Sequence, residues 1–600
     1  MTETAKRLAD VRAIMSQLDA DALFIPRADE YLGEYIPEHN ERLHWISGFT
    51  GSAGMVVVLR DRAAIFVDGR YTVQVRKQVD PDHFEFLHLL EEPPAEWLAG
   101  QLDKGARVAY DPRMHTWQWL QETEKTLDRS GIELLELDAH PVDACWQGRP
   151  QPELHRATLM PESLTGRSSL EKRRETGAAI TARGADAALI FAADSNAWLL
   201  NIRGNDVPCL PVVLGFGLLY ADGNMQFFTD PAKIPPDFGS HAGDGVEILS
   251  EADATSCFEK LAGTRVLVDP ATANAWCHLA LQRAGAERVA SDDPVIMPKA
   301  CKNESELEGM RQSHQRDAVA VVRFLAWLDR EVEAGRLHSE AGLSDRLYSF
   351  RSGGAHFRGP SFDTISAAAG NAAMCHYNHE NFEEVSHLEM DSGYLVDSGG
   401  QYLDGTTDIT RTVAIGDPGA EIRERFTLVL KGHIALNQAV FPEGTTGTQL
   451  DAFARQFLWR AGLDYDHGTG HGVGAFLSVH EGPQRIAKVF NGHGFRAGMV
   501  VSNEPGYYLD NAYGIRCENL EVVRTSAASR NGEPPMLEFE TLTLVPWDAR
   551  LIDIRLLDAP EVEWIDRYHA TVREALEPEL NNDDLAWLQR ATRPLTEQTK

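Results

Sequence analysis

Four acidic residues in the second half of the chain lie within stretches that otherwise have the character of buried strands. Asp397 follows the apolar run YLV, and Asp408 stands in the segment GTTDITRTVAI. Glu504 lies in MVVSNEPGYY, and Glu518 lies in YGIRCENLEVV. An ionised carboxylate is costly to bury alone, so several in such surroundings require a bound cation or pairing among charged neighbours.

For any single acid of this kind, the more ordinary explanation is a strand-end carboxylate that caps the backbone or pairs with Arg411 or Arg516. That explanation weakens when the four acids are considered together with His471. Carboxylates and a neutral imidazole are common ligands of divalent metals. The pattern therefore favours a metal site.

The segment HGTGHGVG carries two histidines, His467 and His471, at a spacing that binds metal when both lie on one helix. Glycines at positions 468, 470 and 472 disfavour a helix. We expect a strand or tight turn, in which the backbone can approach a ligand closely. The sequence contains no HExxH and no GxxxxGK, and GTGHGVG does not match GxGxxG, which removes support for a zincin or a nucleotide-binding protein.

The length and charge of the chain limit the classes of protein to consider. With 600 residues the chain exceeds the roughly 250–300 residues that one hydrophobic core serves, so we expect two to four domains. A composition of 43% hydrophobic and 24% charged residues is typical of folded globular proteins. The net charge of −33 repels phosphate backbones and anionic membrane surfaces, so neither nucleic acid nor a membrane is expected as a partner.

The cysteines and the N-terminus indicate a cytoplasmic protein. The seven cysteines are scattered and never spaced as C-x-x-C, which predicts free buried thiols in a reducing compartment. The first residues carry acids and an i, i+3, i+4 apolar pattern, which is typical of a surface helix rather than a signal peptide. No apolar run approaches the roughly 18–20 residues that cross a bilayer.

The first half of the chain contains a weak internal repeat. A helical segment leads into ADALFI at residues 20–25, and another leads into ADAALI at residues 185–190. Each is followed by a tryptophan, a glycine and then a pattern typical of a strand hairpin. The repeat predicts two related α/β domains, with chance similarity between apolar strands as the alternative. A polar, turn-rich stretch at Gln151–Ser169 favours a boundary there.

After Pro298 the pattern changes to that of a third domain. A long helix is expected from Asn303 or Glu304 to a stop at Gly335, followed by a strand-rich core over residues 362–518. Further helices are expected at Glu421–Phe441 and along the tail from Trp547 to Lys600. We place the three domains at residues 1–155, 156–300 and 301–600.

Four segments together resemble the five-ligand signature of the pita-bread metallopeptidases, family M24. They are DSGGQYLDGTTDITRT, HGTGHGVGAFLSVHEGP, SNEPGYY and GIRCENL. The whole chain resembles the cytosolic aminopeptidase P, or Xaa-Pro aminopeptidase, family, through GFTGSAG, VDGRY, AWLLNIRGND, GPSFDTIS, FETLTLVP and WIDRYH. The resemblance implies an α/β (α+β) fold in which two creatinase-like α/β domains precede a C-terminal pita-bread domain with a helical tail.

The same resemblance implies a ligand set of Asp397, Asp408, His471, Glu504 and Glu518 for two divalent metals. Asp408 and Glu518 would bridge both ions, Asp397 would complete one, and His471 with Glu504 would complete the other. Four carboxylates balance the four positive charges of two such ions. Oxygen-rich ligation suits Mn²⁺, although Zn²⁺ and Co²⁺ compete for such sites.

The resemblance also implies roles around the metals. Glu504 would act as general base, while His376 and His480 would contact the substrate and stabilise the tetrahedral intermediate. His467 would be a third pocket histidine, and Arg70 a substrate-contacting residue from the first domain. Cys517 is expected to face away from the metals, because neighbouring residues on a strand point to opposite faces.

The implied activity is release of the N-terminal residue from peptides with proline in the second position, by a metal-bridging hydroxide, and a homodimer is implied as well. Prolidase and methionine aminopeptidase use similar ligands but leave one or two N-terminal domains unexplained. A catalytically dead pita-bread scaffold that binds peptide or protein partners, or a metal-free creatinase-like hydrolase, conflicts with the presence of all five ligand types.

Overall fold

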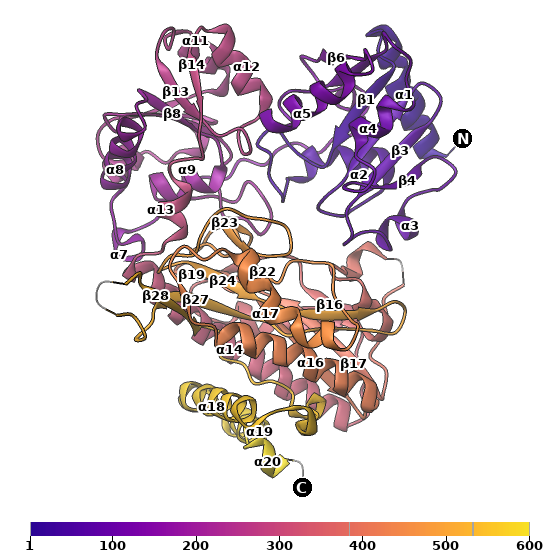
Figure 1. Ribbon diagram of the computed structural model, residues 1–600, viewed down its shortest axis with the longest axis vertical. Coiled ribbons are helices and arrows are strands. Elements are labelled where there is room, and N and C mark those ends of the chain that lie inside the picture. The colour runs from indigo at the N-terminus through magenta and orange to yellow at the C-terminus, as the bar shows by residue number, and fades with distance from the viewer. Residues whose placement is uncertain (1, 383, 531–532, 599–600) are drawn as a thin grey trace. The chain divides into compact units, whose positions relative to one another are not determined.

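The computed structural model describes residues 2–382, 384–530 and 533–598, and it divides into two compact units (Figure 1). The first unit is Met1–Ile296 and the second is Met297–Lys600. Within the described ranges, no helix combines the length and apolar character needed to cross a bilayer. All seven cysteines are described and none forms a disulfide, as predicted; three are buried, whereas Cys145, Cys209, Cys301 and Cys375 are only partly so.

The first unit contains two six-stranded sheets of the same topology. Their strand orders are β4-β3-β2-β1-β5-β6 and β12-β11-β10-β8-β13-β14. In both, the first strand pairs antiparallel with the following hairpin and parallel with the fifth strand in chain order. The repeat predicted from ADALFI and ADAALI is therefore confirmed, since these segments form β1 and β8.

The strands of the two sheets occupy the following residues. In the first sheet they are β1 (Ala22–Pro26), β2 (Met55–Leu59), β3 (Ala63–Val67), β4 (Glu85–His88), β5 (Arg107–Tyr110) and β6 (Glu133–Glu136). In the second they are β8 (Ala187–Ile190), β10 (Phe216–Tyr220), β11 (Met225–Phe228), β12 (Val246–Leu249), β13 (Arg265–Val268) and β14 (Glu287–Ala290). The longer helices of this unit are α1 (Glu3–Gln17), α5 (Trp117–Asp128), α8 (Ser169–Ala182), α9 (Ala193–Leu200) and α12 (Ala275–Arg283).

Strand β1 shows why these segments are apolar throughout rather than alternating. Leu23 and Ile25 pack into one hydrophobic cluster, whereas Ala22 and Phe24 pack into another. Successive side chains on a strand point to opposite faces, so both faces of this sheet are buried. A continuous apolar run is the sequence pattern that such a strand requires.

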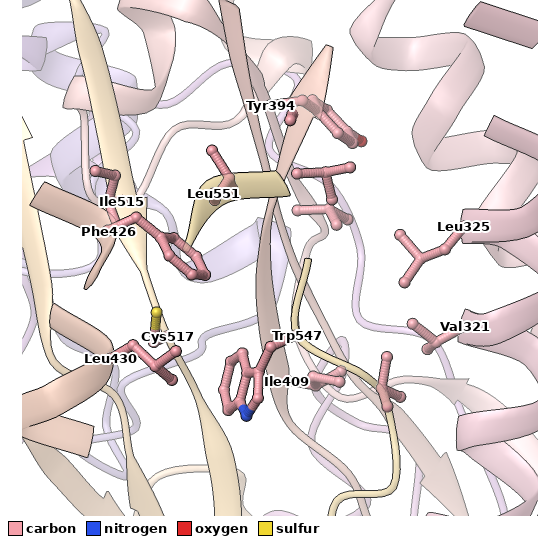
Figure 2. Close-up of a cluster of buried hydrophobic side chains, with 14 of the residues drawn as sticks. Val321, Leu325, Tyr394, Ile409, Phe426, Leu430, Ile515, Cys517, Trp547 and Leu551 are labelled. Carbon is pink, nitrogen blue, oxygen red and sulfur yellow. The ribbon is translucent and has the colours of Figure 1, made fainter. Parts of the chain in front are cut away.

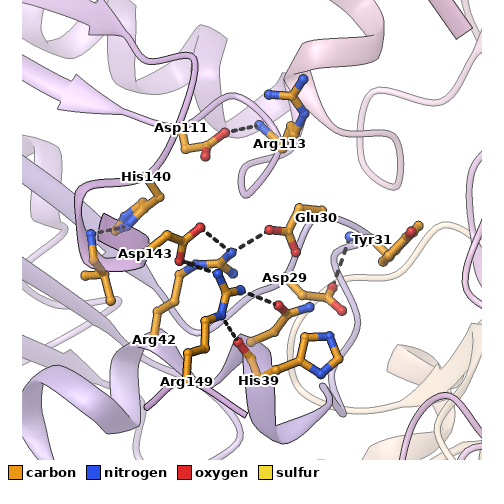
Figure 3. A network of polar contacts seen from close by, with 12 residues as sticks. Asp29, Glu30, Tyr31, His39, Arg42, Asp111, Arg113, His140, Asp143 and Arg149 are labelled. Carbon is orange, nitrogen blue, oxygen red and sulfur yellow. Dashed lines mark hydrogen bonds and ion pairs between the residues drawn. The ribbon is translucent and has the colours of Figure 1, made fainter. Parts of the chain in front are cut away.

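A polar network centred on Arg42 fixes the loop after β1 (Figure 3). Arg42 is 1% exposed and donates to Asp143 Oδ1 at 2.6 Å and to Glu30 Oε1 at 2.5 Å. The backbone N–H of Tyr31 donates to buried Asp29 at 3.0 Å. These bonds offset part of the cost of burying the charges, since Arg42 Nη1 and Asp29 Oδ2 have no hydrogen-bond partner among the described residues.

The second unit is built around two antiparallel sheets. One has the order β16-β17-β20, with strands Ile365–Ala368, Ser392–Ser398 and Ile409–Ile415. The other has the order β21-β28-β27-β24-β22-β23, with strands Phe441–Pro442, Met536–Thr541, Asn519–Thr525, Val500–Asn503, Gly470–Gly472 and Glu481–Ile486. Smaller sheets join β15 (Phe357–Pro360), β18 (Gly400–Tyr402) and β19 (Gly405–Thr406), and pair β25 (Gly506–Leu509) with β26 (Tyr513–Arg516).

Helices pack against these sheets, and most lie where the sequence predicts them. They are α14 (Glu304–Glu333), α15 (Glu340–Ser352), α16 (Gly419–Asn437), α17 (Gly447–Arg460), α18 (Ala559–Leu576), α19 (Asn582–Ala591) and α20 (Leu595–Gln598). Tail residues 599–600 lie outside the described residues. The prediction of a helix to Phe441 is wrong at its end, because Phe441 lies in strand β21 and pairs with Leu537 of β28. Pro442 follows it, and a residue before proline avoids helical backbone angles.

The core of the second unit includes Tyr394 of β17, Ile409 of β20 and Ile515 of β26 (Figure 2). Cys517 is fully buried in this cluster with Phe426, Leu430 and Trp547. Since Cys517 precedes Glu518, its place in the apolar core agrees with the expectation that it faces away from the carboxylates.

The start of α14 gives a test of the fold. The Asn303 side chain accepts hydrogen bonds from the backbone N–H groups of Ser305 and Glu306, and the Glu306 carboxylate accepts one from the Asn303 N–H. Loss of such a cap costs about 1 kcal/mol. Asn303→Ala should lower the urea midpoint of the second unit, whereas Asn303→Ser should keep it near that of the parent protein. Equal midpoints for the alanine and serine variants would contradict a stabilising cap.

Candidate metal centre

Asp397 and Asp408 are brought together by the β17–β20 hairpin. Asp397 pairs with Thr410 in the antiparallel register, and Asp408 lies two residues before Thr410. Residues two apart on a strand point to the same face, so Asp408 and Thr410 share the face of Asp397. The eleven-residue separation in sequence thus becomes close proximity in space.

Glu504 and Glu518 are brought together by the β24–β27 ladder. Asn503 pairs with Asn519 in that antiparallel register. One further step along both strands places Glu504 opposite Glu518, just beyond the last pair. The thirteen residues between them form the excursion that contains β25 and β26.

His471 lies on the short strand β22, which confirms a strand rather than a helix for HGTGHGVG. A Cβ added at Gly470 would lie 2.0 Å from the Ser502 carbonyl oxygen. The glycines therefore allow β22 to approach the neighbouring strand, which places the imidazole beside the acids. His471 Nδ1 lies 3.0 Å from the Gly472 carbonyl oxygen, so Nδ1–H donates there and Nε2 is directed to the carboxylates.

The ligand atoms converge on one small volume. Single ligand atoms of Asp408, His471 and Glu518 all lie within 4.8 Å of one another. His471 Nε2 is 3.5 Å from Asp408 Oδ2 and 3.4 Å from Glu504 Oε1. Asp397 is nearby, and its buried Oδ1 has no hydrogen-bond partner among the described residues. An unsatisfied buried carboxylate oxygen beside three other acids fits a cation-binding cluster.

Burial and mutual repulsion disturb the titration of these acids. Burial, then the neighbouring charges of Asp397 and Glu504, raises the pKa of Asp408 well above its ordinary value. Burial, then Asp408 and Asp397, does the same to the pKa of Glu518. Burial raises the pKa of Glu504 to about 7, although Arg516 opposes the shift. Divalent cations would relieve both causes, since they replace lost hydration and neutralise the carboxylates.

Arg516 is the one arginine or lysine in direct contact with an acid of this cluster among the described ion pairs. The sequence offered it, together with Arg411, as a possible partner of these acids. Its Nη2 donates to Asp397 Oδ2 at 2.5 Å, and its Nη1 donates to the Tyr508 hydroxyl at 2.7 Å. Arg411, the alternative partner, bonds instead to the backbone oxygen of Glu518. One arginine cannot balance four carboxylates, so pairing explains only part of the cluster.

Two hydroxyl groups also orient the acids and were missed from the sequence. Thr410 Oγ1 donates to Glu518 Oε2 at 2.6 Å, and Ser502 Oγ donates to Glu504 Oε1 at 3.0 Å. Thr410 is the residue opposite Asp397 in the β17–β20 pair, so the strand register would have identified it as a neighbour of the acids. Such hydrogen bonds fix carboxylate orientation at metal sites.

The histidines named from the sequence lie in different settings. His480 packs edge-on against His471, with ring centroids 4.4 Å apart. His467 accepts a bond from the Tyr508 hydroxyl at Nε2, 2.8 Å away, and its Nδ1 lies 2.7 Å from the Gly468 carbonyl oxygen. His376 lies in a turn whose preceding residue, Cys375, interacts through its thiol with Tyr508.

Arg70 belongs to the first compact unit, in the loop after β3. Its Nη2 pairs with Asp68 Oδ2 at 2.8 Å, and its guanidinium lies over the Tyr71 ring. These contacts hold the guanidinium in a defined orientation within that unit.

Models of known families match consecutive parts of the chain. Residues 308–525 match metallopeptidase family M24, and residues 535–595 match the C-terminal region of that family. Residues 7–143 and 148–306 match two models of the creatinase/prolidase N-terminal domain. The second unit therefore contains an M24 metallopeptidase domain, preceded by two creatinase-type domains, and the expected α/β fold class is confirmed.

Full-length relatives narrow the family. The chain is 39% identical to aminopeptidase P2 of Arabidopsis thaliana, over 98% of this chain and 88% of the relative. It is 38% identical to a probable Xaa-Pro aminopeptidase P of Paracoccidioides brasiliensis, over 99% of both. The chain belongs to the aminopeptidase P family.

A solved structure agrees with this family. The X-prolyl aminopeptidase of Caenorhabditis elegans, a cytosolic enzyme with a di-nuclear active site, shares 32% identity with this chain at a TM-score of 0.93. The match covers 99% of this chain and all of that one. The shared fold thus extends through both N-terminal domains.

The raised pKa values predict how the cation-free protein responds to pH. Glu504 in the folded chain holds its proton up to about pH 7, whereas in the unfolded chain it loses it near its ordinary value of 4.5. Between these values the folded state binds more protons, so the free energy of unfolding falls as the pH rises. After chelation, the melting temperature should be higher at pH 5 than at pH 7.5.

The variant Asp408→Asn tests whether the acid cluster causes this pH dependence of the melting temperature, because it changes the net charge of −33 by only one unit. It removes one of the repelling carboxylates, so the fall in melting temperature between pH 5 and 7.5 should be smaller than in the parent protein. Identical pH dependence in the two proteins would argue against strain among these acids.

Proposed function

We propose that the chain is a dinuclear metallo-aminopeptidase that releases the N-terminal residue from peptides with proline in the second position. The observation that carries the proposal is the convergence of Asp408, His471 and Glu518, with Asp397 and Glu504 beside them. The names of the full-length relatives, which are Xaa-Pro or X-prolyl aminopeptidases, support the choice of substrate class.

The donor set fits two divalent cations. Asp408 and Glu518 would bridge them, Asp397 would complete the ligation of one, and His471 with Glu504 that of the other. Four carboxylates offset the charge of two such ions. The oxygen-rich set suits Mn²⁺, although the usual order of affinities lets Zn²⁺ and Co²⁺ compete for such a site. When bound, such ions polarise the scissile carbonyl and activate water for attack on it.

The protein's own groups would handle the protons and orient the substrate. Glu504 would accept a proton from the attacking water as the new C–O bond forms and the carbonyl carbon becomes tetrahedral. It would then give that proton to the proline nitrogen as the peptide C–N bond breaks. His480, beside His471, and His376 would donate hydrogen bonds to the carbonyl oxygen as negative charge develops there. His467 would be a third pocket histidine, held by bonds from both ring nitrogens within the protein and by packing against Tyr465.

Other parts of the proposal concern the whole protein. The domains span residues 1–155, 156–300 and 301–600, and Arg70 is the substrate-contacting residue of the first. We further infer a homodimer in the cytoplasm, which acts on peptides and binds neither nucleic acid nor membranes. The free cysteines and the net charge of −33 support the compartment and the excluded partners.

Peptide assays test the activity directly. With Mn²⁺ added to the metal-free protein, a peptide of the form Xaa-Pro-Xaa should lose its first residue, with much slower release from the Xaa-Pro dipeptide. Replacing the second residue by alanine provides the control for proline preference. Failure to cleave any Xaa-Pro-Xaa peptide with Mn²⁺, Co²⁺ or Zn²⁺ would rule out the proposed activity.

The metal assignment has a separate test in Asp408→Ala. Loss of a bridging carboxylate should reduce bound metal well below two ions per chain and lower kcat by about 10³-fold or more. A suitable control is Asp404→Ala, since Asp404 is also buried but pairs with Arg316 outside the cluster. Elemental analysis that finds two ions per chain in the Asp408 variant would contradict the bridging role.

A further inference from the structure

The turn that carries His376 has defined structural supports. It joins the 3₁₀ helix Ala369–Ala373 to a second one at His379–Asn381. Beside His376, the Cys375 thiol interacts with Tyr508, whose hydroxyl contacts Arg516 and His467. The turn therefore borders the hydrogen-bonded groups that reach Asp397.

One fully buried carboxylate, that of Glu340, binds this turn on both sides of His376. Glu340 Oε1 accepts the backbone N–H of Ala368 at 2.7 Å and the side-chain amide of Asn371 at 3.0 Å. Glu340 Oε2 accepts the Tyr377 hydroxyl at 2.7 Å. Two of these donors precede His376 and one follows it directly.

The position of Glu340 suits a negative charge. It is 0% exposed and occupies the first turn of α15, after the capping residue Ser339. Free N–H groups at the start of a helix favour an anion there. Strong hydrogen bonds from Ala368, Asn371 and Tyr377 further compensate for its burial.

The opposite side of the turn is also closely packed. A Cβ added at Gly514 of β26 would lie 1.8 Å from the carbonyl oxygen of Ala372. The turn is thus held between Glu340 and the strand that ends at Arg516. In such packing, loss of the Glu340 contacts would shift the turn.

We propose that Glu340 is a positioning residue for His376: its carboxylate fixes both sides of the turn, so that His376 is held ready for the substrate carbonyl. Glu340 itself touches no reacting atom. The inference rests on the proposed function, since the position of His376 affects turnover only if the chain cleaves peptides.

Three variants at this contact differ in what they remove. Glu340→Ala deletes every acceptor, and Tyr377→Phe deletes a single hydrogen bond with little change of shape. Glu340→Gln keeps an acceptor for Ala368 and offers an N–H to the Tyr377 oxygen. The matched control is Tyr402→Phe, since Tyr402 is as buried as Tyr377 and donates to Asp317 at 2.8 Å.

Steady-state kinetics on an Xaa-Pro-Xaa peptide should separate these variants. Glu340→Ala should lower kcat about 30-fold or more and Tyr377→Phe about 3- to 10-fold, with bound metal unchanged. Glu340→Gln should restore kcat to within about 3-fold of the parent protein. In a His376→Ala background, Glu340→Ala should cause no further loss, because the two changes act through one group.

Hydrogen exchange measured by mass spectrometry reports the turn independently of activity. Peptides that cover residues 369–378 should exchange faster in Glu340→Ala and Tyr377→Phe, but not in Tyr402→Phe. Unchanged exchange there, or losses that multiply with His376→Ala, would overturn the proposal. If the parent protein cleaves no peptide, the proposed function fails, while exchange still decides whether Glu340 holds the turn.

Discussion

The strands of the second unit bring four carboxylates into one buried cluster, and the rest of that unit must compensate for the repulsion among them. Burial and the charges of neighbouring carboxylates raise the pKa values of Asp408, Glu504 and Glu518. One arginine, Arg516, and two hydroxyl groups compensate for part of this cost. The remaining imbalance is what a pair of divalent cations would remove, so metal binding and stability of the fold are coupled here.

The acids could be identified from the sequence because burial gives them an unusual context. A carboxylate within a run of β-branched and aromatic residues is conspicuous, and Asp397, Asp408, Glu504 and Glu518 all have that context. The repeat that forms β1 and β8 was visible for a similar reason, since strands buried on both faces require continuous apolar runs. Patterns of this kind can be recognised in the local sequence, without knowledge of the tertiary structure.

Contacts between distant segments could not be predicted in the same way. Arg516, Tyr508 and His467 form a chain of hydrogen bonds whose members come from separate strands and loops. Nothing in the local sequence distinguishes Arg516 from Arg411 as the partner of Asp397. The predicted end of α16 was also wrong. Phe441 is apolar enough for a helix face, but it lies in a strand that pairs with Leu537 of β28.

The segment between Glu504 and Glu518 forms a hairpin that takes no part in the strand pairing that brings these two acids together. Strand pairing of β24 with β27 sets the distance between the two acids, whereas β25 and β26 pair only with each other. The tip of that hairpin packs elsewhere: a Cβ added at Gly370 would lie 3.0 Å from the carbonyl oxygen of Asn511, so the tip abuts the 3₁₀ helix that leads to His376. Arg516 lies at the base of the hairpin, where it contacts Asp397. A change at the tip would thus reach the turn of His376 before it reached Glu504 or Glu518.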